Sequence, residues 1–456
     1  MRHLTVIAFI LLVMCHFEVV SQPCLPDGVF FTTQSQIDSF PINYPGCTEI
    51  DGFVSIGGNN ITNLNGLNAV TSMDWLWITD ADSLTNLQGL ESLSLVENNL
   101  FIRNNDELVS LYGLENLTII GGDLEIDNNN KLLNLSGIGN LTVLEGGLLI
   151  SDNDSLLSLT LFEKLHYIGT YLQFTRNGLI TDFSGLDSIK TVGGAVVIWD
   201  NIQLSSFTGL EQIQTINGGL HIGLNPSILN LTGLRDISSI EDGVVIYQNS
   251  SLKNLQGLDS LSSIGGYFEI IDNDELISLE HFIKTNSIGG HLEISSNYEL
   301  PSLLGLDSIN GSSIENLYIF ENDFLSVCDV HSICDYLSSP NGTVEIYDNN
   351  QSCNSIEEVV EACTVSVPEF PDEVGITTYP NPISTVTTIA YELSEPTHIQ
   401  LTIYNHLGEA VEEAMSAYKS PGVHTYTWNA ERLSEGMYFA VLRSEDGVSV
   451  VKLIKQ

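Results

Sequence analysis

The sequence predicts an all-β protein: a parallel β-solenoid fills most of the chain, and a small β-sandwich follows it. Three observations predict this fold. Gly-Leu pairs recur at a nearly constant spacing, apolar residues recur at fixed positions between them, and short segments alternate apolar with polar residues. One such repeat cannot bury its own apolar side, so we expect neighbouring repeats to stack on one another.

The glycine of the Gly-Leu pair defines the register of the repeats. The step from Gly66 to Gly89 is one position shorter than the later steps, each of which is 24 or twice 24. Leu161 and His281 stand where two coils lack the glycine. The register predicts about eleven coils between about Phe53 and Asn310. Its glycines are Gly66, Gly89, Gly113, Gly137, Gly185, Gly209, Gly233, Gly257 and Gly305.

Each coil is expected to contain a short strand with one buried face. In the segment Gly122–Ile126 the apolar residues alternate with polar ones, which is the two-residue period of a strand. The apolar column that includes Ile102, Ile126 and Ile150 must then point into a shared interior. The glycine before the strand, Gly122 in this coil, predicts a tight corner with unusual backbone angles.

An asparagine follows the strand at the same position in nine consecutive coils. Stacked amide side chains can bond to one another and to turn backbone along a β stack. We therefore expect a structural ladder rather than a catalytic site. Its members are Asn105, Asn129, Asn153, Asn177, Asn201, Asn225, Asn249, Asn273 and Asn297.

Charge and the N-terminal residues restrict the possible partners. The chain has 14 Lys plus Arg against 58 Asp plus Glu, a formal net charge of −44, which disfavours nucleic acids and anionic membranes.

Arg2 and His3 precede an apolar run, Leu4–Cys15, so residues 1–21 are expected to be a secretory signal peptide. No later stretch is apolar enough for a transmembrane span.

Six cysteines follow the expected signal peptide, and none lies within the repeats. An even number in an exported chain predicts disulfides. Metal ligation is the alternative, but no Cys-x-x-Cys pair exists. The cysteines are Cys24, Cys47, Cys328, Cys334, Cys353 and Cys363.

The coils resemble the receptor L-domain branch of leucine-rich repeat proteins. The resemblance covers about residues 24–363 and rests on units such as Leu111–Leu114 followed by Ile120–Ile126. It implies a single-stranded, right-handed β-helix with one parallel sheet per face and a disulfide-bonded cap at each end. Tyr44–Cys47 before the first coil and the last four cysteines fit such caps.

Terminal units must differ from the repeats they cover, which agrees with the presence of caps. We hypothesise that the cysteines of the caps form three pairs. These are Cys24 with Cys47, Cys328 with Cys353, and Cys334 with Cys363.

The last eighty residues have a different composition. The segment Val367–Asp372 is typical of a linker, and alternating segments such as Ile399–Tyr404 predict an Ig-like β-sandwich. These residues resemble the type A sorting domain of the bacterial type IX secretion system. The resemblance rests on Tyr379–Pro382, Tyr404–Gly408, Gly436–Tyr438 and Val451–Gln456.

The second resemblance implies handling by the type IX secretion machinery and a secreted or cell-surface location in a Gram-negative bacterium. The residues matched to the sorting motifs are Tyr379, Pro380, Asn381, Pro382, Gly408, Gly436, Lys452 and Lys455. The expected boundaries are 1–21 signal peptide, 22–52 N-terminal cap, 53–310 solenoid, 311–363 C-terminal cap, 364–375 linker and 376–456 sorting domain.

No catalytic motif accompanies this organisation, and we expect no enzyme activity, cofactor or metal site. His166, His221, His281 and His291 fall in different columns and do not converge. The enzyme alternative is a polysaccharide lyase, but Arg103 and Arg176 lack an obvious basic companion. The acidic run Asp123, Glu125 and Asp127 could bind calcium. A solvated face is the favoured interpretation of that run.

Aromatic residues alternate with the core positions of the strands and predict a ligand-binding face for an unknown protein or glycan. Strand propensity and stacking down a column would also favour aromatic residues, and the alternative function is a passive surface repeat without a ligand. The predicted face consists of Trp75, Trp77, Phe101, Tyr171, Trp199, Tyr247 and Tyr267.

Overall fold

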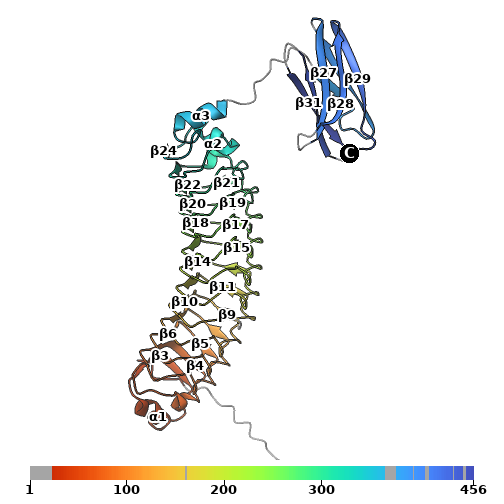
Figure 1. The fold of residues 1–456 in the computed structure, drawn as a ribbon. Coiled ribbons are helices and arrows are strands. Elements are labelled where there is room, and N and C mark those ends of the chain that lie inside the picture. Colours follow the sequence, from red (N-terminus) through yellow and green to blue (C-terminus); the bar gives the residue numbers. More distant parts are fainter. Residues whose placement is uncertain are drawn as a thin grey trace, which may run out of the picture. The chain divides into compact units, whose positions relative to one another are not determined.

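The chain forms two compact units that divide between Cys363 and Thr364 (Figure 1). The computed structural model describes residues 23–159, 162–364, 376–393, 395–405, 410–434, 436–444 and 448–456. The expected signal peptide, and the expected linker apart from Thr364, lie outside these residues. No helix within the described ranges is long and apolar enough to cross a membrane.

The first unit is a β-solenoid, as the sequence predicts, and it has about 13 turns. Figure 1 shows its strands stacked one above another, with α1 at one end and α2 and α3 at the other. The longer strands are β3 (Glu49–Ile56), β4 (Ser72–Thr79), β6 (Leu100–Arg103), β8 (Leu124–Asp127), β10 (Leu148–Ser151), β12 (Leu172–Thr175), β14 (Val196–Trp199), β16 (Leu220–Gly223), β18 (Val244–Tyr247), β20 (Phe268–Ile271), β22 (Leu292–Ser295), β23 (Leu317–Phe320) and β24 (Val344–Tyr347).

A second row of two-residue strands stacks beside these longer ones. Its strands are β5 (Leu95–Val96), β7 (Ile119–Ile120), β9 (Val143–Leu144), β11 (Tyr167–Ile168), β13 (Thr191–Val192), β15 (Thr215–Ile216), β17 (Ser239–Ile240), β19 (Ser263–Ile264) and β21 (Ser287–Ile288). On a further side, neighbouring coils meet through isolated parallel bridges such as Asn134 with Ser158. Two short strands, β1 (Pro23–Cys24) and β2 (Val29–Phe31), pair with β3 at the N-terminal end.

All pairing in the solenoid is parallel, and most of it joins positions that are 24 apart in the chain. Ile126 of β8, for example, pairs with Ile150 of β10. The first and third residues of each four-residue strand point inward, so the predicted apolar columns are buried. They form one continuous core from Phe31 to Val359. The core therefore depends on the register, because a slip of one residue would turn every apolar side chain outward.

The asparagine ladder is confirmed, and it extends beyond the nine predicted members to Asn322 and Asn349. Each ladder side chain is nearly or fully buried up to Asn322. The Oδ1 of Asn201 accepts a bond from the backbone N–H of Asn177 at 3.1 Å. Its Nδ2 donates to the carbonyls of Phe174 at 3.1 Å and Trp199 at 3.2 Å. One amide thus satisfies backbone groups in two coils at once.

The residue before each ladder asparagine adopts the left-handed conformation, although it is not glycine. Asn128, for example, has φ 52°. Glycine serves the other left-handed position, that of the Gly-Leu pair, where Gly113 has φ 117°. A Cβ on Gly113 would also lie 2.1 Å from the carbonyl oxygen of Leu87, so close stacking excludes a side chain there.

The expectation of unusual backbone angles at Gly122 and its equivalents was wrong, because their φ values are not positive. Space explains the glycine instead. A Cβ at Gly122 would lie 2.0 Å from Asn99 Oδ1 and 2.8 Å from the carbonyl carbon of Asn98. The preceding coil therefore approaches this corner too closely for a side chain.

The solenoid has about 13 turns rather than eleven because the sheet continues past the expected boundary at Asn310. Ile294 pairs with Ile319, and Ile319 pairs with Ile346. The ladder asparagines of these turns show the longer spacing: Asn297 and Asn322 are 25 residues apart in the chain, and Asn322 and Asn349 are 27 apart. The insertions that lengthen these steps include helix α2 (His331–Ser338). They break the period that identifies the other coils.

Both ends of the solenoid carry helices and disulfides. Helix α1 (Gln34–Asn43) lies at the N-terminal end, where Cys24 is bonded to Cys47. Helices α2 and α3 (Ile356–Thr364) lie at the other end. There Cys328 is bonded to Cys353 and Cys334 to Cys363, with Cα–Cα distances of 5.7 and 5.6 Å. These are the three pairs hypothesised from the sequence.

The second unit is an antiparallel β-sandwich of a three-stranded and a four-stranded sheet. Its core includes Trp428, Ile403 and Leu453. Tyr426 and Trp428 of one sheet donate hydrogen bonds to Glu412 of the other, at 2.6 and 3.1 Å. The strands are β25 (Ile376–Tyr379), β26 (Val386–Leu393), β27 (Thr397–Asn405), β28 (Ala410–Lys419), β29 (Gly422–Asn429), β30 (Gly436–Arg443) and β31 (Val448–Lys455).

Replacing a ladder asparagine is expected to destabilise the solenoid. Asn201→Ala leaves the N–H of Asn177 and the C=O of Phe174 buried without their side-chain partner, at a cost of about 2–5 kcal/mol in the free energy of unfolding. Urea denaturation followed by circular dichroism measures this loss. The control is Asn217→Ala at an exposed corner, which should change stability by less than about 0.5 kcal/mol. Equal stability of the two variants would contradict a structural ladder.

Candidate functional site

The candidate site is the outer face of the sheet formed by β4 to β23. In each four-residue strand the second and fourth residues, and the residue just before the strand, point outward, and in the longer strand β4 the equivalent positions are Trp77, Thr79 and Trp75. The seven predicted aromatic residues occupy these three outward columns, and all seven are half-buried rather than fully exposed. Their rings are therefore partly packed on neighbouring coils.

The structure brings four of the seven together in two pairs. Trp77 and Phe101 have ring centroids 5.2 Å apart, and Trp199 and Tyr247 have centroids 5.7 Å apart. Among the described residues, no ring contact joins Trp75, Tyr171 or Tyr267 to these pairs. The predicted face is thus a series of separate aromatic positions along the solenoid.

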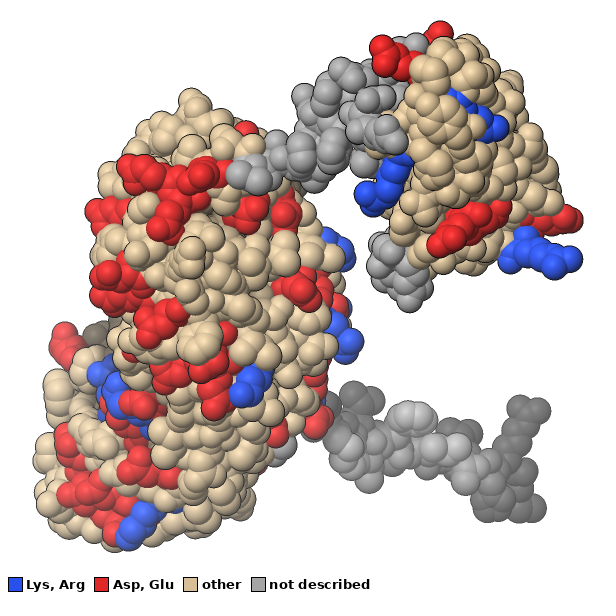
Figure 2. Space-filling view, turned by 45° about the horizontal axis from the view of Figure 1, so that its top comes forward, with Lys and Arg blue, Asp and Glu red and all other residues tan. Residues whose placement is uncertain are grey.

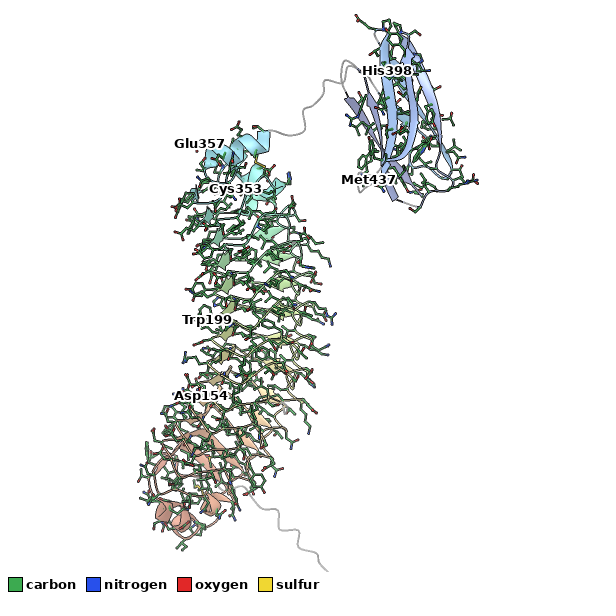
Figure 3. All side chains as sticks on the ribbon, in the orientation of Figure 1. Asp154, Trp199, Cys353, Glu357, His398 and Met437 are labelled. Carbon is green, nitrogen blue, oxygen red and sulfur yellow. A yellow bond between two sulfur atoms is a disulfide. The ribbon has the colours of Figure 1, made fainter. Side chains whose placement is uncertain are left out.

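Trp199 and Tyr247 belong to strands that are two coils apart, and their rings meet over the strand between them. Their planes are inclined by only 13°. Gly223 of β16 lies in register between the two residues. A Cβ on Gly223 would lie 2.4 Å from the Trp199 ring, so the missing side chain provides the space in which the indole lies. Trp199 lies on one long side of the solenoid, about midway along it (Figure 3).

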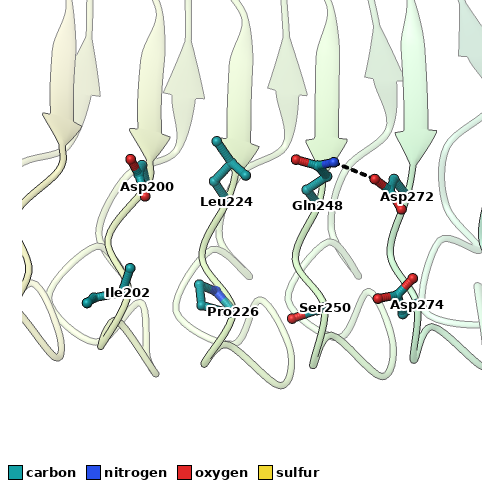
Figure 4. Close-up of a pocket in the computed structure, with 8 residues that line it drawn as sticks. All are labelled: Asp200, Ile202, Leu224, Pro226, Gln248, Ser250, Asp272 and Asp274. Atoms are coloured by element: carbon teal, nitrogen blue, oxygen red, sulfur yellow. Dashed lines mark hydrogen bonds between the residues drawn. The ribbon is translucent and has the colours of Figure 1, made fainter.

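A hollow of about 340 Å³ opens at the corner that follows these strands (Figure 4). Asp200 and Gln248 of its lining directly follow Trp199 and Tyr247 in the chain, although neither ring lines the hollow itself. Gln248 donates a hydrogen bond to Asp272 in the row of lining residues next to the strands. The lining combines apolar and hydrogen-bonding groups in two rows, Asp200, Leu224, Gln248 and Asp272 next to the strands and Ile202, Pro226, Ser250 and Asp274 two residues further.

The other pair belongs to a larger aromatic cluster that sequence reasoning recognised only in part. Phe30 and Phe53 extend it towards the N-terminal end, with Phe30–Phe53 and Phe53–Trp77 centroid distances of 5.6 and 4.9 Å. The Arg103 guanidinium lies 4.3 Å from the Phe101 centroid. The Trp77 Nε1 is buried and has no hydrogen-bond partner among the described residues, which indicates a packed indole. In the register of β3 and β4 Phe53 is opposite Trp75 and Ser55 is opposite Trp77, so the repeat spacing of 24 could not have revealed this continuation.

The acidic run is occupied by contacts within the protein. Asp123 accepts a hydrogen bond from the Gly147 N–H at 2.7 Å. Glu125 forms an ion pair with Arg103. Asp127 accepts a hydrogen bond from Ser151. Because all three carboxylates have partners within the protein, the run is better described as part of the sheet surface than as a cation site.

The two arginines considered for a lyase are each paired with a carboxylate, Arg103 with Glu125 and Arg176 with Asp152. Hydrogen bonding to Asp152 raises the pKa of Arg176 further above its usual value. Neither arginine is accompanied by a histidine or lysine that could act as a base in the contacts described. Each of these ion pairs joins side chains of two adjacent coils.

One histidine does meet carboxylates on the outer face. The donor atoms of Glu269, His291 and Glu293 lie within 4.8 Å of one another. His291 is also stacked on Tyr267, with centroids 5.4 Å apart and planes inclined by 11°. Burial, followed by the charges of Glu269 and Asp242, raises the pKa of Tyr267. The sequence pattern did not predict this group, since its members stand in two different columns.

Acidic side chains are spread over the face of the solenoid in Figure 2, with few basic ones among them. This distribution matches the formal net charge of −44. An acidic ligand would be repelled by the side of the solenoid seen in this view, which therefore suits neutral or cationic ligands.

In the second unit, the first sorting motif contacts the last strand through Asn381. Asn381 donates from Nδ2 to the carbonyl of Lys452 at 2.6 Å and accepts at Oδ1 from the N–H of Ile454 at 2.9 Å. The first motif is thus joined to the last strand. Lys455 forms a bridge with Ile383, and Gly436 begins β30 with φ 153°. Tyr379 is 83% exposed, and Gly408 lies outside the described residues.

Comparison with known families identifies this second unit. Residues 377–456 match the family model of the secretion system C-terminal sorting domain, which leaves the solenoid outside the match. The match indicates handling by the type IX secretion machinery and points to a secreted or cell-surface location. A search of curated proteins finds no match to the chain.

Tyr171 gives the sheet face a measurable pH dependence. Burial, followed by the charge and hydrogen bond of Asp123, raises the pKa of Tyr171 to about 12 from the usual value of about 10. Between these values the folded state keeps a proton that the unfolded state releases. The stabilising effect is thus complete below about pH 10 and is lost as pH rises towards about 12.

We expect the free energy of unfolding of the solenoid to fall less steeply over this range in Tyr171→Phe than in the unaltered chain. Denaturant unfolding at several pH values measures the slope. Tyr426, whose pKa is also raised to about 12, by its hydrogen bond to Glu412 and by burial, lies in the second unit. Tyr426→Phe should therefore leave the solenoid slope unchanged. Identical slopes for Tyr171→Phe and the unaltered chain would refute the assignment.

Proposed function

We propose that this chain is a secreted or cell-surface adhesion protein without enzyme activity, and that the solenoid binds an uncharged glycan at Trp199 and Tyr247. The stacked pair of rings beside the open hollow carries this proposal. The match of residues 377–456 to a sorting domain supports export by the type IX system.

The chemistry of a sugar fits the two parts of this site. The C–H groups on one side of a pyranose ring are apolar and pack against aromatic rings, while the hydroxyls need hydrogen-bond partners. Trp199 and Tyr247 supply aromatic surface, and Asp200, Gln248 and Asp272 supply acceptors and donors next to it. A planar aromatic surface flanked by polar groups can hold a sugar without performing chemistry on it.

The charge and length of the solenoid favour an uncharged and extended ligand. The net charge of −44 repels acidic polysaccharides. The aromatic positions recur along parallel strands spaced about 4.8 Å apart, so a chain of sugar units could contact several coils. A cationic or neutral protein could also use such a face. The binding test below separates these ligands.

The repeats themselves are proposed to belong to the receptor L-domain branch of leucine-rich repeat proteins. The apolar columns, the buried asparagine ladder and the disulfide-bonded ends support this assignment. A scaffold of this kind presents one regular sheet for recognition. The assignment concerns the architecture and does not identify the ligand.

The alternative is a passive surface repeat in which the aromatic rings only cover glycines of neighbouring coils. Tyr171 lies over Gly147 and Tyr267 over Gly243, where a Cβ would approach each ring to 2.5 and 2.4 Å. Such packing is sufficient to explain those two rings. The hollow beside Trp199 and Tyr247 favours a binding role at that position.

The first test is binding to arrays of neutral glycans, acidic glycans and extracellular proteins. We expect binding to neutral glycans, and a loss of at least tenfold in affinity in the double variant Trp199→Ala, Tyr247→Ala, because the aromatic surface is removed. Surface plasmon resonance measures the affinity. Tyr112→Ala, which removes a 52% exposed ring elsewhere on the solenoid, is the matched control.

Circular dichroism should show that the double variant keeps its fold, since both rings lie on the outer face. Unchanged glycan affinity in that variant would exclude this site. A chain that binds nothing on any array would favour the passive repeat, and binding to proteins alone would replace the glycan as ligand.

The second test addresses export. In cells with a type IX system, the full chain should become accessible to protease added outside, whereas a chain lacking residues 377–456 should stay protected in the periplasm. Mass spectrometry of the surface fraction also shows whether the sorting domain is removed. The Trp199→Ala, Tyr247→Ala variant should be exported like the unaltered chain. Surface exposure of the truncated chain would contradict the role of the second unit.

A further inference from the structure

Glu269, His291 and Glu293 combine two carboxylates and an imidazole on two adjacent coils. Their donor atoms lie within 4.8 Å of one another. His291 Nε2 and Glu269 Oε1 are 2.9 Å apart. Ligand atoms of a tetrahedral zinc ion, each about 2.1 Å from the metal, are about 3.4 Å apart, so modest side-chain movement would form such a site.

The two carboxylates are arranged unfavourably without a cation. Glu269 of β20 and Glu293 of β22 are register partners on neighbouring parallel strands. Like charges directly opposite each other destabilise a sheet. Glu125 occupies the same outward column of an earlier coil, and there Arg103 forms an ion pair with it. Among the ion pairs of the described residues, the Glu269 and Glu293 position has only His291 as its basic group.

The imidazole is held in position by its neighbours. Its ring lies between Tyr267, at 5.4 Å and nearly parallel, and Tyr318, at 5.8 Å and inclined by 72°. Glu293 Oε1 accepts a hydrogen bond from Ser295 at 2.9 Å, which orients that carboxylate while its second oxygen can still coordinate. Groups that fix the orientation of ligands in this way are typical of metal sites.

We infer that Glu269, His291 and Glu293 form a binding site for one divalent cation of the zinc class. An imidazole together with carboxylates suits zinc better than calcium or magnesium, which prefer oxygen ligands alone. His291 and Glu269 side chains are 29% and 22% exposed, so an ion can enter from solvent. Three protein ligands leave at least one coordination position for water or for a group of an external ligand. Glu269, His291 and Glu293 would bind the ion whether or not the solenoid binds a glycan.

The experiment is isothermal titration of the tag-free chain with zinc chloride, and separately with calcium and magnesium chloride. We expect one equivalent of zinc to bind, with calcium and magnesium at least tenfold weaker. Glu269→Gln and Glu293→Gln keep the size of each side chain and remove its charge, and each should weaken zinc binding at least tenfold. His281→Asn is the matched control, because His281 pairs with the single carboxylate Asp259 at 2.9 Å.

Thermal unfolding distinguishes lost binding from lost structure. Without zinc, both Gln variants should unfold at or above the temperature of the unaltered chain, because like-charge repulsion is removed. With zinc, the unfolding temperature should rise in the unaltered chain and in His281→Asn but not in the Gln variants. Absence of zinc binding, equal binding of calcium, or zinc affinity unchanged in both Gln variants would overturn the inference.

Discussion

The stacking of one coil on the next in a constant register is the constraint on which the rest of the molecule depends. A single coil has almost no interior of its own. Its apolar side chains are buried only because those of the neighbouring coils lie directly above and below them. The asparagine ladder enforces this register, since each amide bonds to backbone groups of its own coil and of the one before. Packing and hydrogen bonding therefore specify the same alignment.

The same register organises the outer face. Residues that recur at the same position in every coil form columns, and a glycine in a column gives space to a large ring from a coil beside it. Gly223 lies under Trp199, and Tyr247 reaches the same indole from the opposite side. The pair is thus a consequence of one small residue in the middle strand. An alanine there would displace the indole, so the proposed binding surface depends on the close backbone of the middle strand as well as on the two rings.

The period made the fold, the buried columns and the ladder predictable, because each is a contact between equivalent positions of adjacent coils. Contacts at other spacings were missed. Arg103 with Glu125 and His291 with Glu269 each have a separation of 22 in the chain, which joins different columns of adjacent coils diagonally. The last two turns were missed because insertions lengthen the step to 25 and then to 27. The half-burial of the aromatic rings could not be predicted either, since it depends on how far each ring leans over the next coil.

The position of the carboxylate–imidazole group gives the two proposed sites a physical relation. Glu269 lies on β20, the strand that pairs directly with β18, where Tyr247 is found. Tyr247 is in register with Ile271, two residues along β20 from Glu269, so a short glycan that contacts Tyr247 and crosses the sheet diagonally would reach the group. A metal ion there with an open coordination position could accept a hydroxyl oxygen of the ligand. Zinc would then strengthen glycan binding, and by thermodynamic linkage the glycan would strengthen zinc binding equally. Independent affinities would instead mean that the ion only offsets the repulsion between Glu269 and Glu293 and stabilises the stacking of their coils.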